Sequence, residues 1–298
     1  MVTIAAMPAF NEENHIAKTI IGCRKYVDKV VVVDDGSSDA TAEIAEALGA
    51  IVIKHPENRG YGAALQTIFK TAREMNADKM VIIDSDGQHD PREIPKLIEP
   101  LNNGADIVIG SRFVNGNGKN VPAYRKVGMK VLDAATNIAG EINVSDSQSG
   151  FRAYRRRAIE KIRIKDNDMS AGSEILMQMK DHDLKFEEVE IHCNYGVEKT
   201  SSKNPMAYGF SVLMSILNNV GTKRPVAYLG LPGTILILIG IFYGGWTIEL
   251  YSSTKILPIG NALISVMATI IGVFSVFTAI ILYTITNFFE KMGFSKQS

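Results

Sequence analysis

The sequence contains little of what several classes of protein require. Only two of its 298 residues are cysteine, Cys23 and Cys193, which is too few for a disulfide framework or a cysteine-rich zinc site and fits a reducing compartment. Lysine plus arginine and aspartate plus glutamate number 32 each, so the chain lacks the basic excess that neutralises nucleic-acid phosphates. We therefore expect no nucleic acid among its partners.

Apolar side chains are abundant, and they are unevenly distributed. Hydrophobic residues make up 46% of the chain, enough for a sizeable core. Residues 225–248 and 256–289 contain no charged side chain at all. Each run exceeds the roughly 20 apolar residues that cross about 30 Å of hydrocarbon. Buried core helices are the alternative, but an uncharged run of this length is rarely one. We expect two transmembrane helices within residues 225–289, joined as a hairpin.

The charges that flank these runs predict an orientation. Lys223 and Arg224 precede the first run, and Lys291 and Lys296 follow the second, whereas the connecting loop is charge-balanced. By the positive-inside rule, we expect a soluble domain over residues 1–204 and a tail over residues 290–298 to face the cytoplasm of a cell-membrane protein. Because the N-terminus leads straight into a strand-like run, we expect no signal peptide.

Residues 205–224 lie between the soluble part and the first run. They place Met206, Phe210 and Leu213 at helical spacing. A core-facing helix would show the same pattern. The neighbouring Lys223 and the following span favour a juxtamembrane helix that lies in the membrane interface.

The soluble part alternates β-branched runs with amphipathic stretches. Strands are expected at residues 2–7, 29–34, 50–54, 79–84 and 105–110, and helices at residues 12–25, 40–48, 60–75 and 91–101. This alternation predicts an α/β fold, a Rossmann-like and mostly parallel sheet with helices on both faces. Ligands of such sheets bind beyond the carboxyl ends of the strands, so the residues that follow each strand are the candidates for a site.

The loops that follow the strands lack both common phosphate-binding motifs. No Gly-x-Gly-x-x-Gly follows the first strand, and no Gly-x4-Gly-Lys-Ser/Thr is present. Instead the loops are acidic, which is unsuited to holding phosphate directly and suited to a divalent metal. Asp84, Asp86 and Gln88 alternate along an extended segment and would converge as hard oxygen ligands for Mg2+ or Mn2+. An acidic turn that caps the helix after Pro91 is the alternative reading.

Taken together, these motifs resemble those of the family-2 glycosyltransferases with a GT-A fold, over about residues 1–205. The matching segments are Pro8-Ala9-x-Asn11-Glu12, Asp34-Asp35-Gly36-Ser37-x-Asp39, Asp84-x-Asp86-x-Gln88-His89 and Gly110-Ser111-Arg112. Within that family, Asp146-Ser-Gln-Ser-Gly-Phe-Arg152 and Lys199-x-x-Ser-Lys203 look like the polyprenyl-phosphate group, which includes dolichyl-phosphate mannose and glucose synthases. Processive polysaccharide synthases usually carry Gln-x-x-Arg-Trp, whereas the single tryptophan here, Trp246, lies in an apolar run.

The resemblance implies a role for each matching residue. The residues implied to bind the donor are Pro8, Ala9, Asn11, Glu12, Asp35, Asp84 and Lys199. Those implied to bind the metal are Asp84, Asp86 and Gln88. The residues implied to bind the acceptor phosphate are Arg112, Arg125 and Arg152. Those implied to be catalytic are Asp86, Arg112 and Asp146. Arginine suits phosphate because its guanidinium is a planar fork of donors. Asp146 is implied either to orient the acceptor or to take a proton.

These roles imply an inverting, metal-dependent transfer of one sugar from GDP-mannose or a UDP-sugar to dolichyl or polyprenyl phosphate. The partners would be the nucleotide sugar, the lipid phosphate and membrane lipid, with a homo-oligomer left open. A transferase to another membrane lipid is an alternative, although a hydroxyl acceptor would need a stronger general base. A non-catalytic nucleotide-sugar-binding scaffold is a second alternative, disfavoured because all three metal-ligand positions are kept.

Overall fold

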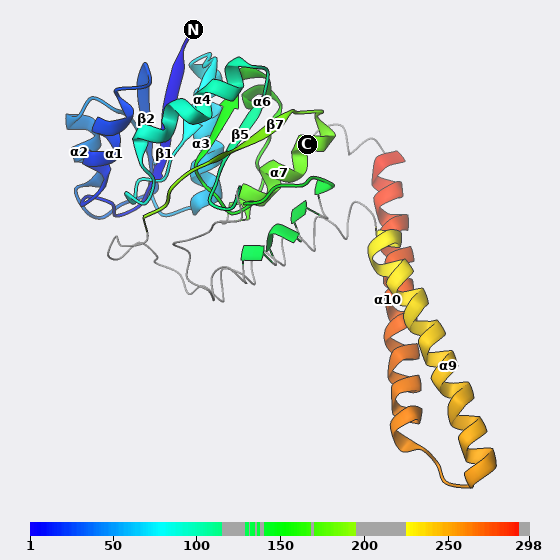
Figure 1. Cartoon of the computed structure of the whole chain (residues 1–298). Helices are drawn as coiled ribbons and strands as arrows, with labels where there is room; N and C mark the ends of the chain where they lie inside the picture. Colours follow the sequence, from blue (N-terminus) through cyan, green and yellow to red (C-terminus); the bar gives the residue numbers. More distant parts are fainter. Residues whose placement is uncertain are drawn as a thin grey trace. The chain divides into compact units, whose positions relative to one another are not determined.

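The computed structural model describes residues 1–114, 129–130, 132–134, 136–137, 140–167, 170–194 and 225–291 (Figure 1). The chain divides into two compact units, Met1–Ile216 and Leu217–Ser298, which are described separately below. The juxtamembrane helix expected at residues 205–224 lies outside the described residues, as do the tail residues after 291.

The first unit is built around a seven-stranded sheet with the order β3-β2-β1-β4-β6-β5-β7. Its strands are β1 (Thr3–Ala9), β2 (Lys29–Asp34), β3 (Ile51–Lys54), β4 (Lys79–Ile82), β5 (Ile107–Ser111), β6 (Arg152–Arg155) and β7 (Phe186–Glu190). All pairings are parallel except the two made by β6, which runs antiparallel between β4 and β5. The mostly parallel sheet predicted from the sequence is therefore confirmed.

Helices cover both faces of this sheet, because successive strand residues point to opposite sides. Ile4 and Ala6 of β1 belong to one apolar cluster, which also contains side chains of α3 (Tyr61–Glu74), α6 (Arg156–Lys161) and α7 (Ala171–Asp181). Ala5 and Met7 belong to the second cluster, with side chains of α1 (Ile16–Cys23), α2 (Thr41–Ala47) and α4 (Ile94–Asn102). The near-continuous apolar strands are thus explained by burial on both faces.

The predicted elements occur close to their expected bounds. The first helix begins at Ile16 rather than at residue 12, because Asn11 adopts a left-handed conformation (φ 56°) and residues 12–15 form a turn in which His15 N–H bonds to the Glu12 carbonyl. The last predicted helix begins as the 3-10 turn η1 (Pro91–Glu93), capped by the Asp90 side chain, before α4. β6, β7, α6 and α7 were not among the predicted elements.

The second unit contains two long helices, α9 (Leu231–Thr254) and α10 (Ile259–Lys291), preceded by the π-helical turn η2 (Val226–Gly230). The segments Leu231–Thr254 and Ile259–Ile285 have mean hydropathies of 1.7 and 2.4 and are long enough to cross a membrane. Only 17% of each apolar window is buried, whereas a core helix of a soluble protein would be mostly buried. Both are therefore candidate membrane spans, as the sequence predicted.

Small residues bring these two helices together. The position of a Cβ on Gly233 lies 2.9 Å from the Gly272 carbonyl oxygen, so neither glycine tolerates a side chain without a shift. The Ser265 hydroxyl donates to the Gly240 carbonyl oxygen at 2.7 Å, which adds an interhelical hydrogen bond. Close approach at small residues, joined by a hydroxyl bond, is typical of packing between membrane helices.

Candidate active site

The loops that follow β1 and β2 are held together by side-chain-to-backbone hydrogen bonds. The Asn11 N–H donates to the Ser37 hydroxyl at 2.9 Å, and the Asn11 side-chain oxygen accepts from the Ser38 N–H at 2.9 Å. The Glu12 N–H donates to the Thr41 hydroxyl at 2.7 Å. The left-handed backbone of Asn11 directs these groups toward the second loop, so the expected donor-binding residues Asn11 and Glu12 sit in a fixed double loop.

Pro8 and Ala9 belong to the end of β1 rather than to the loop that follows it. The Ser85 hydroxyl donates to the Pro8 carbonyl oxygen at 2.8 Å. That bond ties the end of β1 to the acidic loop after β4, so the first and third of the predicted motifs are adjacent in the structure.

Asp35 organises a loop that the sequence did not single out. Its carboxylate lies 2.7 Å from His55 Nδ1 and accepts the N–H groups of Arg59 at 3.0 Å and Gly60 at 2.8 Å. The residue is 4% exposed. Its partners shape residues 55–60, the connection from β3 to α3, and this is the role that the structure assigns to Asp35.

The acidic loop after β4 concentrates negative charge. Burial and the neighbouring charge of Asp86 together raise the pKa of Asp84 to about 7. Burial also raises the pKa of Asp86, although its carboxylate accepts the Gln88 N–H at 2.9 Å. The nearby Glu12 has its pKa raised to about 7, first by burial and then by the charges of Asp86 and other acidic neighbours. A bound cation would relieve this repulsion.

The donor set at this loop fits Mg2+ or Mn2+. Two carboxylates and one amide oxygen are hard ligands, and magnesium commonly binds one or two carboxylates while substrate phosphates and water fill its other positions. Within the described parts of the chain, no group of three or more histidine, cysteine, aspartate or glutamate side chains forms a closed metal cluster. An open site of this kind, completed by a substrate phosphate, remains consistent with Asp84, Asp86 and Gln88.

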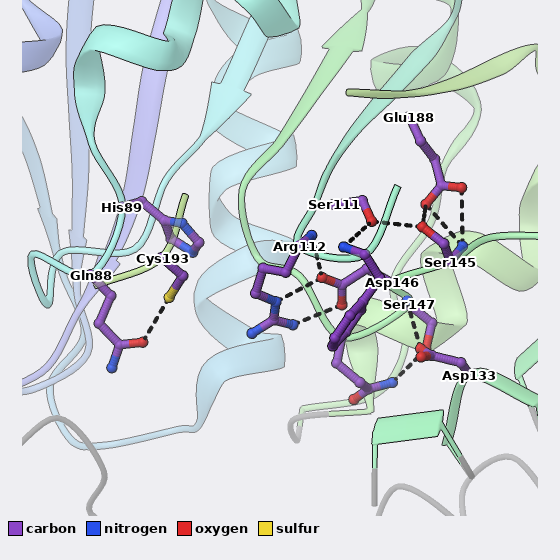
Figure 2. Close-up of polar contacts among 12 residues, drawn as sticks. Gln88, His89, Ser111, Arg112, Asp133, Ser145, Asp146, Ser147, Glu188 and Cys193 are labelled. Atoms are coloured by element: carbon purple, nitrogen blue, oxygen red, sulfur yellow. Dashed lines mark hydrogen bonds and ion pairs between the residues drawn. The ribbon is translucent and has the colours of Figure 1, made fainter. Parts of the chain in front are cut away.

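Gln88 and His89 are fixed by a segment that follows β7. Cys193 Sγ contacts Gln88 Oε1 at 3.5 Å (Figure 2). The Asn194 N–H donates to the Gln88 carbonyl oxygen at 2.9 Å. His89 is buried and forms an antiparallel bridge with Cys193. Burial, together with the charge of Arg112, lowers the pKa of His89 to about 4, so its ring is neutral near pH 7.

Gly150 leaves room for the Asp84 carboxylate. A Cβ at residue 150 would lie 2.5 Å from Asp84 Oδ2 and 3.0 Å from Oδ1, closer than the ordinary contact range of 3.4–4 Å. The Ser-Gly-Phe segment before β6 therefore packs against the acidic loop, and this fixes the space in which Asp84 lies.

Arg112 and Asp146 form a two-pronged ion pair beside the acidic loop. Arg112 Nε donates to Asp146 Oδ2 at 2.7 Å, and one terminal nitrogen donates to Oδ1 at 2.7 Å (Figure 2). The Arg112 N–H also donates to Oδ2 at 3.0 Å. Asp146 is completely buried. Its carboxylate is therefore committed to Arg112, an arrangement that orients the guanidinium and does not favour Asp146 as a proton acceptor.

Arg152 has a different environment from the one expected. It is 3% exposed, and its guanidinium donates to the carbonyl oxygens of Gly172 at 2.7 Å and Ser147 at 2.6 Å. These bonds give Arg152 a structural task, joining α7 to the segment before β6, rather than a contact with an acceptor phosphate. Arg125 and Lys199 lie outside the described residues, so their expected roles stay predictions.

The network around Arg112 includes residues that the motifs did not identify as functional. Ser111, Asp133, Ser145, Ser147 and Glu188 all bond to one another or to the Asp146 segment (Figure 2). Glu188 is a polar residue inside a strand, and Asp133 lies within an otherwise apolar stretch, which is the only local signal that either carries a role.

Comparison with known proteins identifies the family. The model described as glycosyl transferase family 2 matches residues 5–163, more than half of the chain. The chain therefore belongs to glycosyl transferase family 2, and it is a glycosyltransferase.

Two named relatives and one solved structure place the chain more closely. The UDP-N-acetylglucosamine–dolichyl-phosphate N-acetylglucosaminyltransferase of Methanococcus voltae is 34% identical over 233 residues, covering 71% of this chain and 93% of that protein. The dolichol-phosphate mannosyltransferase of Pyrococcus furiosus is 32% identical over 206 residues, covering 64% of this chain but only 55% of that protein. The glucosyl-3-phosphoglycerate synthase of Mycobacterium tuberculosis, solved with Mn2+, UDP and glucosyl-3-phosphoglycerate, superposes with a TM-score of 0.55 at 23% identity, covering 74% of this chain and 80% of that one. The last likeness confirms the GT-A fold.

Proposed function

We propose that this glycosyltransferase moves one sugar from a nucleoside-diphosphate sugar to a polyprenyl phosphate of the dolichyl type, with inversion at the anomeric carbon. One observation carries the proposal: an acidic loop suited to a metal–diphosphate lies next to a fixed arginine suited to a second phosphate. The two are close enough that the charge of Arg112 partly offsets the rise in the pKa of Asp84.

Both named relatives have a dolichyl or dolichol phosphate in their names, which supports this class of acceptor. One is named for a UDP-sugar and the other for mannose transfer, so a UDP-sugar and GDP-mannose are the two donors to test. We assign base and ribose contacts to the end of β1 and to the double loop, through Pro8, Ala9, Asn11 and Glu12, with Asp35 shaping residues 55–60, and a diphosphate contact to Lys199.

Asp84, Asp86 and Gln88 would hold Mg2+ or Mn2+, and the Mn2+ bound in the mycobacterial structure supports a divalent ion. When bound, the ion supplies a Lewis acid that stabilises the departing nucleoside diphosphate.

Arg112, together with Arg125, would bind the acceptor phosphate. A phosphate monoester carries between one and two negative charges near neutrality and is a competent nucleophile without a strong base. The requirement is therefore to hold one anion beside another, and a fixed guanidinium meets it. Asp146 acts by orienting Arg112, and Arg152 supports the fold behind it. The neutral, buried His89 borders Asp84 at 3.8 Å and would help to exclude water.

The membrane arrangement is part of the same proposal. Residues 1–204 form the cytoplasmic catalytic domain, residues 205–224 a helix at the membrane interface, residues 225–289 a two-helix hairpin and residues 290–298 a cytoplasmic tail. A polyprenyl tail is too apolar to leave the bilayer, since each buried methylene contributes about 0.8 kcal/mol. The acceptor phosphate therefore stays at headgroup depth, and a hairpin anchor keeps the enzyme where its acceptor is.

A donor panel tests the function directly. Membranes that contain the full-length protein would be incubated with dolichyl phosphate and with labelled UDP-sugars or GDP-mannose, and label would be followed into the organic phase. We expect one donor to give an organic-soluble product whose label is released by mild acid. Transfer that proceeds equally well without dolichyl phosphate, to an endogenous lipid alcohol, would contradict the phosphate acceptor.

A further inference from the structure

Glu188 holds the residue next to Asp146 by three hydrogen bonds. The Ser145 N–H donates to both carboxylate oxygens of Glu188, at 2.9 and 3.0 Å, and the Ser145 hydroxyl donates to Oε1 at 2.8 Å (Figure 2). Glu188 lies on β7 at the edge of the sheet, 43 residues from Ser145 along the chain. A half-buried carboxylate on an edge strand is more often solvated, so this convergence of donors calls for an explanation.

The same contact continues to the residue that precedes Arg112. The hydroxyls of Ser145 and Ser111 are 2.6 Å apart, and Ser111 Oγ accepts the Phe113 N–H at 3.1 Å. An ionised carboxylate only accepts, so Ser145 gives its proton to Glu188 and must accept the proton of Ser111. The resulting chain runs from Phe113 N–H through two hydroxyls to Glu188. It fixes the backbone on both sides of Arg112.

The other side of Asp146 is held in a matching way. Asp133 accepts the Ser147 N–H at 2.8 Å and the Ser147 hydroxyl at 2.6 Å. Asp146 thus lies between two serines that are each held by a separate carboxylate. Because the Asp146 side chain is completely buried and bonds Arg112 through both oxygens, the direction of the guanidinium depends on where these two serines lie.

We propose that Glu188 is a positioning residue for the acceptor phosphate: through Ser145 and Asp146 it sets the direction of the Arg112 guanidinium. The proposal rests on the proposed function, since it takes Arg112 to bind that phosphate. It gives β7, which contributes no motif residue, a task in acceptor recognition. Hydrogen-bonded groups that orient a functional side chain commonly matter almost as much as the side chain itself.

The test is Glu188→Gln in the full-length protein, assayed with a short isoprenyl phosphate as acceptor. An amide keeps one acceptor oxygen but turns an N–H2 group toward the Ser145 N–H, so Ser145 should shift. We expect the KM for the acceptor to rise about tenfold, as a misdirected group would cause, while the donor KM and the metal titration stay near wild type. Glu187→Gln is the matched control, because Glu187 is the adjacent, exposed carboxylate of the same strand, and it should leave every constant unchanged. Ser111→Ala breaks the chain with a smaller change and should raise the acceptor KM in the same way if Glu188→Gln folds poorly.

A double mutant separates positioning from a general structural role. If Glu188 acts through Arg112, adding Glu188→Gln to Arg112→Ala should change the acceptor KM no further. Equal rises in donor and acceptor KM, or additive effects in the double mutant, would overturn the positioning role. An unchanged acceptor KM in both Glu188→Gln and Ser111→Ala, alongside a raised one in Arg112→Ala, would overturn this inference alone. An unchanged acceptor KM in Arg112→Ala would instead remove the acceptor assignment on which it rests.

Discussion

Replacing Gly150 with alanine is expected to displace Asp84 and to impair transfer without unfolding the protein. The φ angle of Gly150 lies outside the left-handed region, so alanine can adopt its backbone and only space is at issue. The new Cβ would lie 2.5 Å from Asp84 Oδ2, whereas ordinary contact begins at 3.4 Å. The carboxylate must therefore move by close to 1 Å, and a misplacement of about 1 Å at a reacting centre costs about 100-fold in rate.

The stability cost should be smaller than the catalytic one. Overpacking costs roughly 1–3 kcal/mol when a core cannot adjust, and Asp84 is a half-buried side chain with some freedom to rotate. We expect kcat/KM to fall by about 100-fold, the Mn2+ concentration for half-maximal activity to rise and the thermal midpoint to change little.

Gly172→Ala provides the matched control. It makes the same chemical change in α7, where the new Cβ would lie 3.6 Å from an Arg152 nitrogen, an ordinary contact. It should leave activity unchanged and stabilise the helix by up to about 1 kcal/mol. Wild-type turnover and wild-type metal affinity in a folded Gly150→Ala protein would refute the placement of Asp84 at the centre of the site.

Three further predictions concern the metal, a buried acid and the membrane hairpin. EDTA should abolish transfer, and Asp86→Ala should lower kcat by orders of magnitude while far-ultraviolet circular dichroism stays unchanged; near-normal turnover of the folded variant would remove Asp86 from the metal site. Burial raises the pKa of Asp133 to about 6, so the folded state holds a proton that the unfolded state loses near pH 4, and stability should fall as pH rises from 4 to 6. Asp133→Asn keeps an acceptor oxygen for Ser147 and should remove most of this loss of stability, which amounts to roughly 3 kcal/mol at most above pH 6. Thermal melts of the detergent-solubilised protein across this pH range would measure it. An unchanged pH profile in the variant would show that Asp133 does not titrate between pH 4 and 6. Single cysteines at residues 252 and 298 should be labelled from the outside and from the inside of cells respectively, and the opposite labelling pattern would reverse the orientation.

The first five strands, the helices between them and the acidic loop could be predicted because their signals are local. Val30–Val33 are buried on both faces of the sheet and read as an uninterrupted β-branched run. Asp84 and Asp86 follow a buried strand directly, and the carboxyl ends of parallel strands meet at one edge. In both cases a few adjacent residues determine the structure.

β6 gave no such signal. Its sequence Arg-Ala-Tyr-Arg has an arginine at each end and contains no apolar run that would mark a buried strand, yet it lies between β4 and β5 with Arg152 almost fully buried. The charge is tolerated there because carbonyl oxygens of Gly172 and Ser147 accept its N–H groups. Those carbonyls come from other segments, so no window of sequence around β6 contains the reason for its burial.

The hydrogen-bond partners of the site residues could not be predicted either, because they come from distant parts of the sequence. Arg112 and Asp146 are 34 residues apart, and Glu188 is 43 residues from the serine that it holds. Motif positions indicated that Arg112 and Asp146 matter, but not that each is the other's main partner. The distinction changes the chemistry, because a buried carboxylate with both oxygens bonded to a guanidinium serves to orient that cation.

The candidate site has two halves, one around Arg112 and one around Asp84. They differ in how far protein groups alone provide partners for the charged side chains. Around Arg112 the carboxylates of Asp146, Glu188 and Asp133 each accept hydrogen bonds from the protein, so this half of the site is held in place by the fold itself. Around Asp84 the carboxylates raise one another's pKa, because burial and like charge are not compensated by protein donors. A cation with its nucleotide would relieve the second half and would not be needed by the first. On the proposed assignment, the metal and the donor would be the ligands to which the empty site is least adapted, and the acceptor phosphate would meet an arginine that is already held in place.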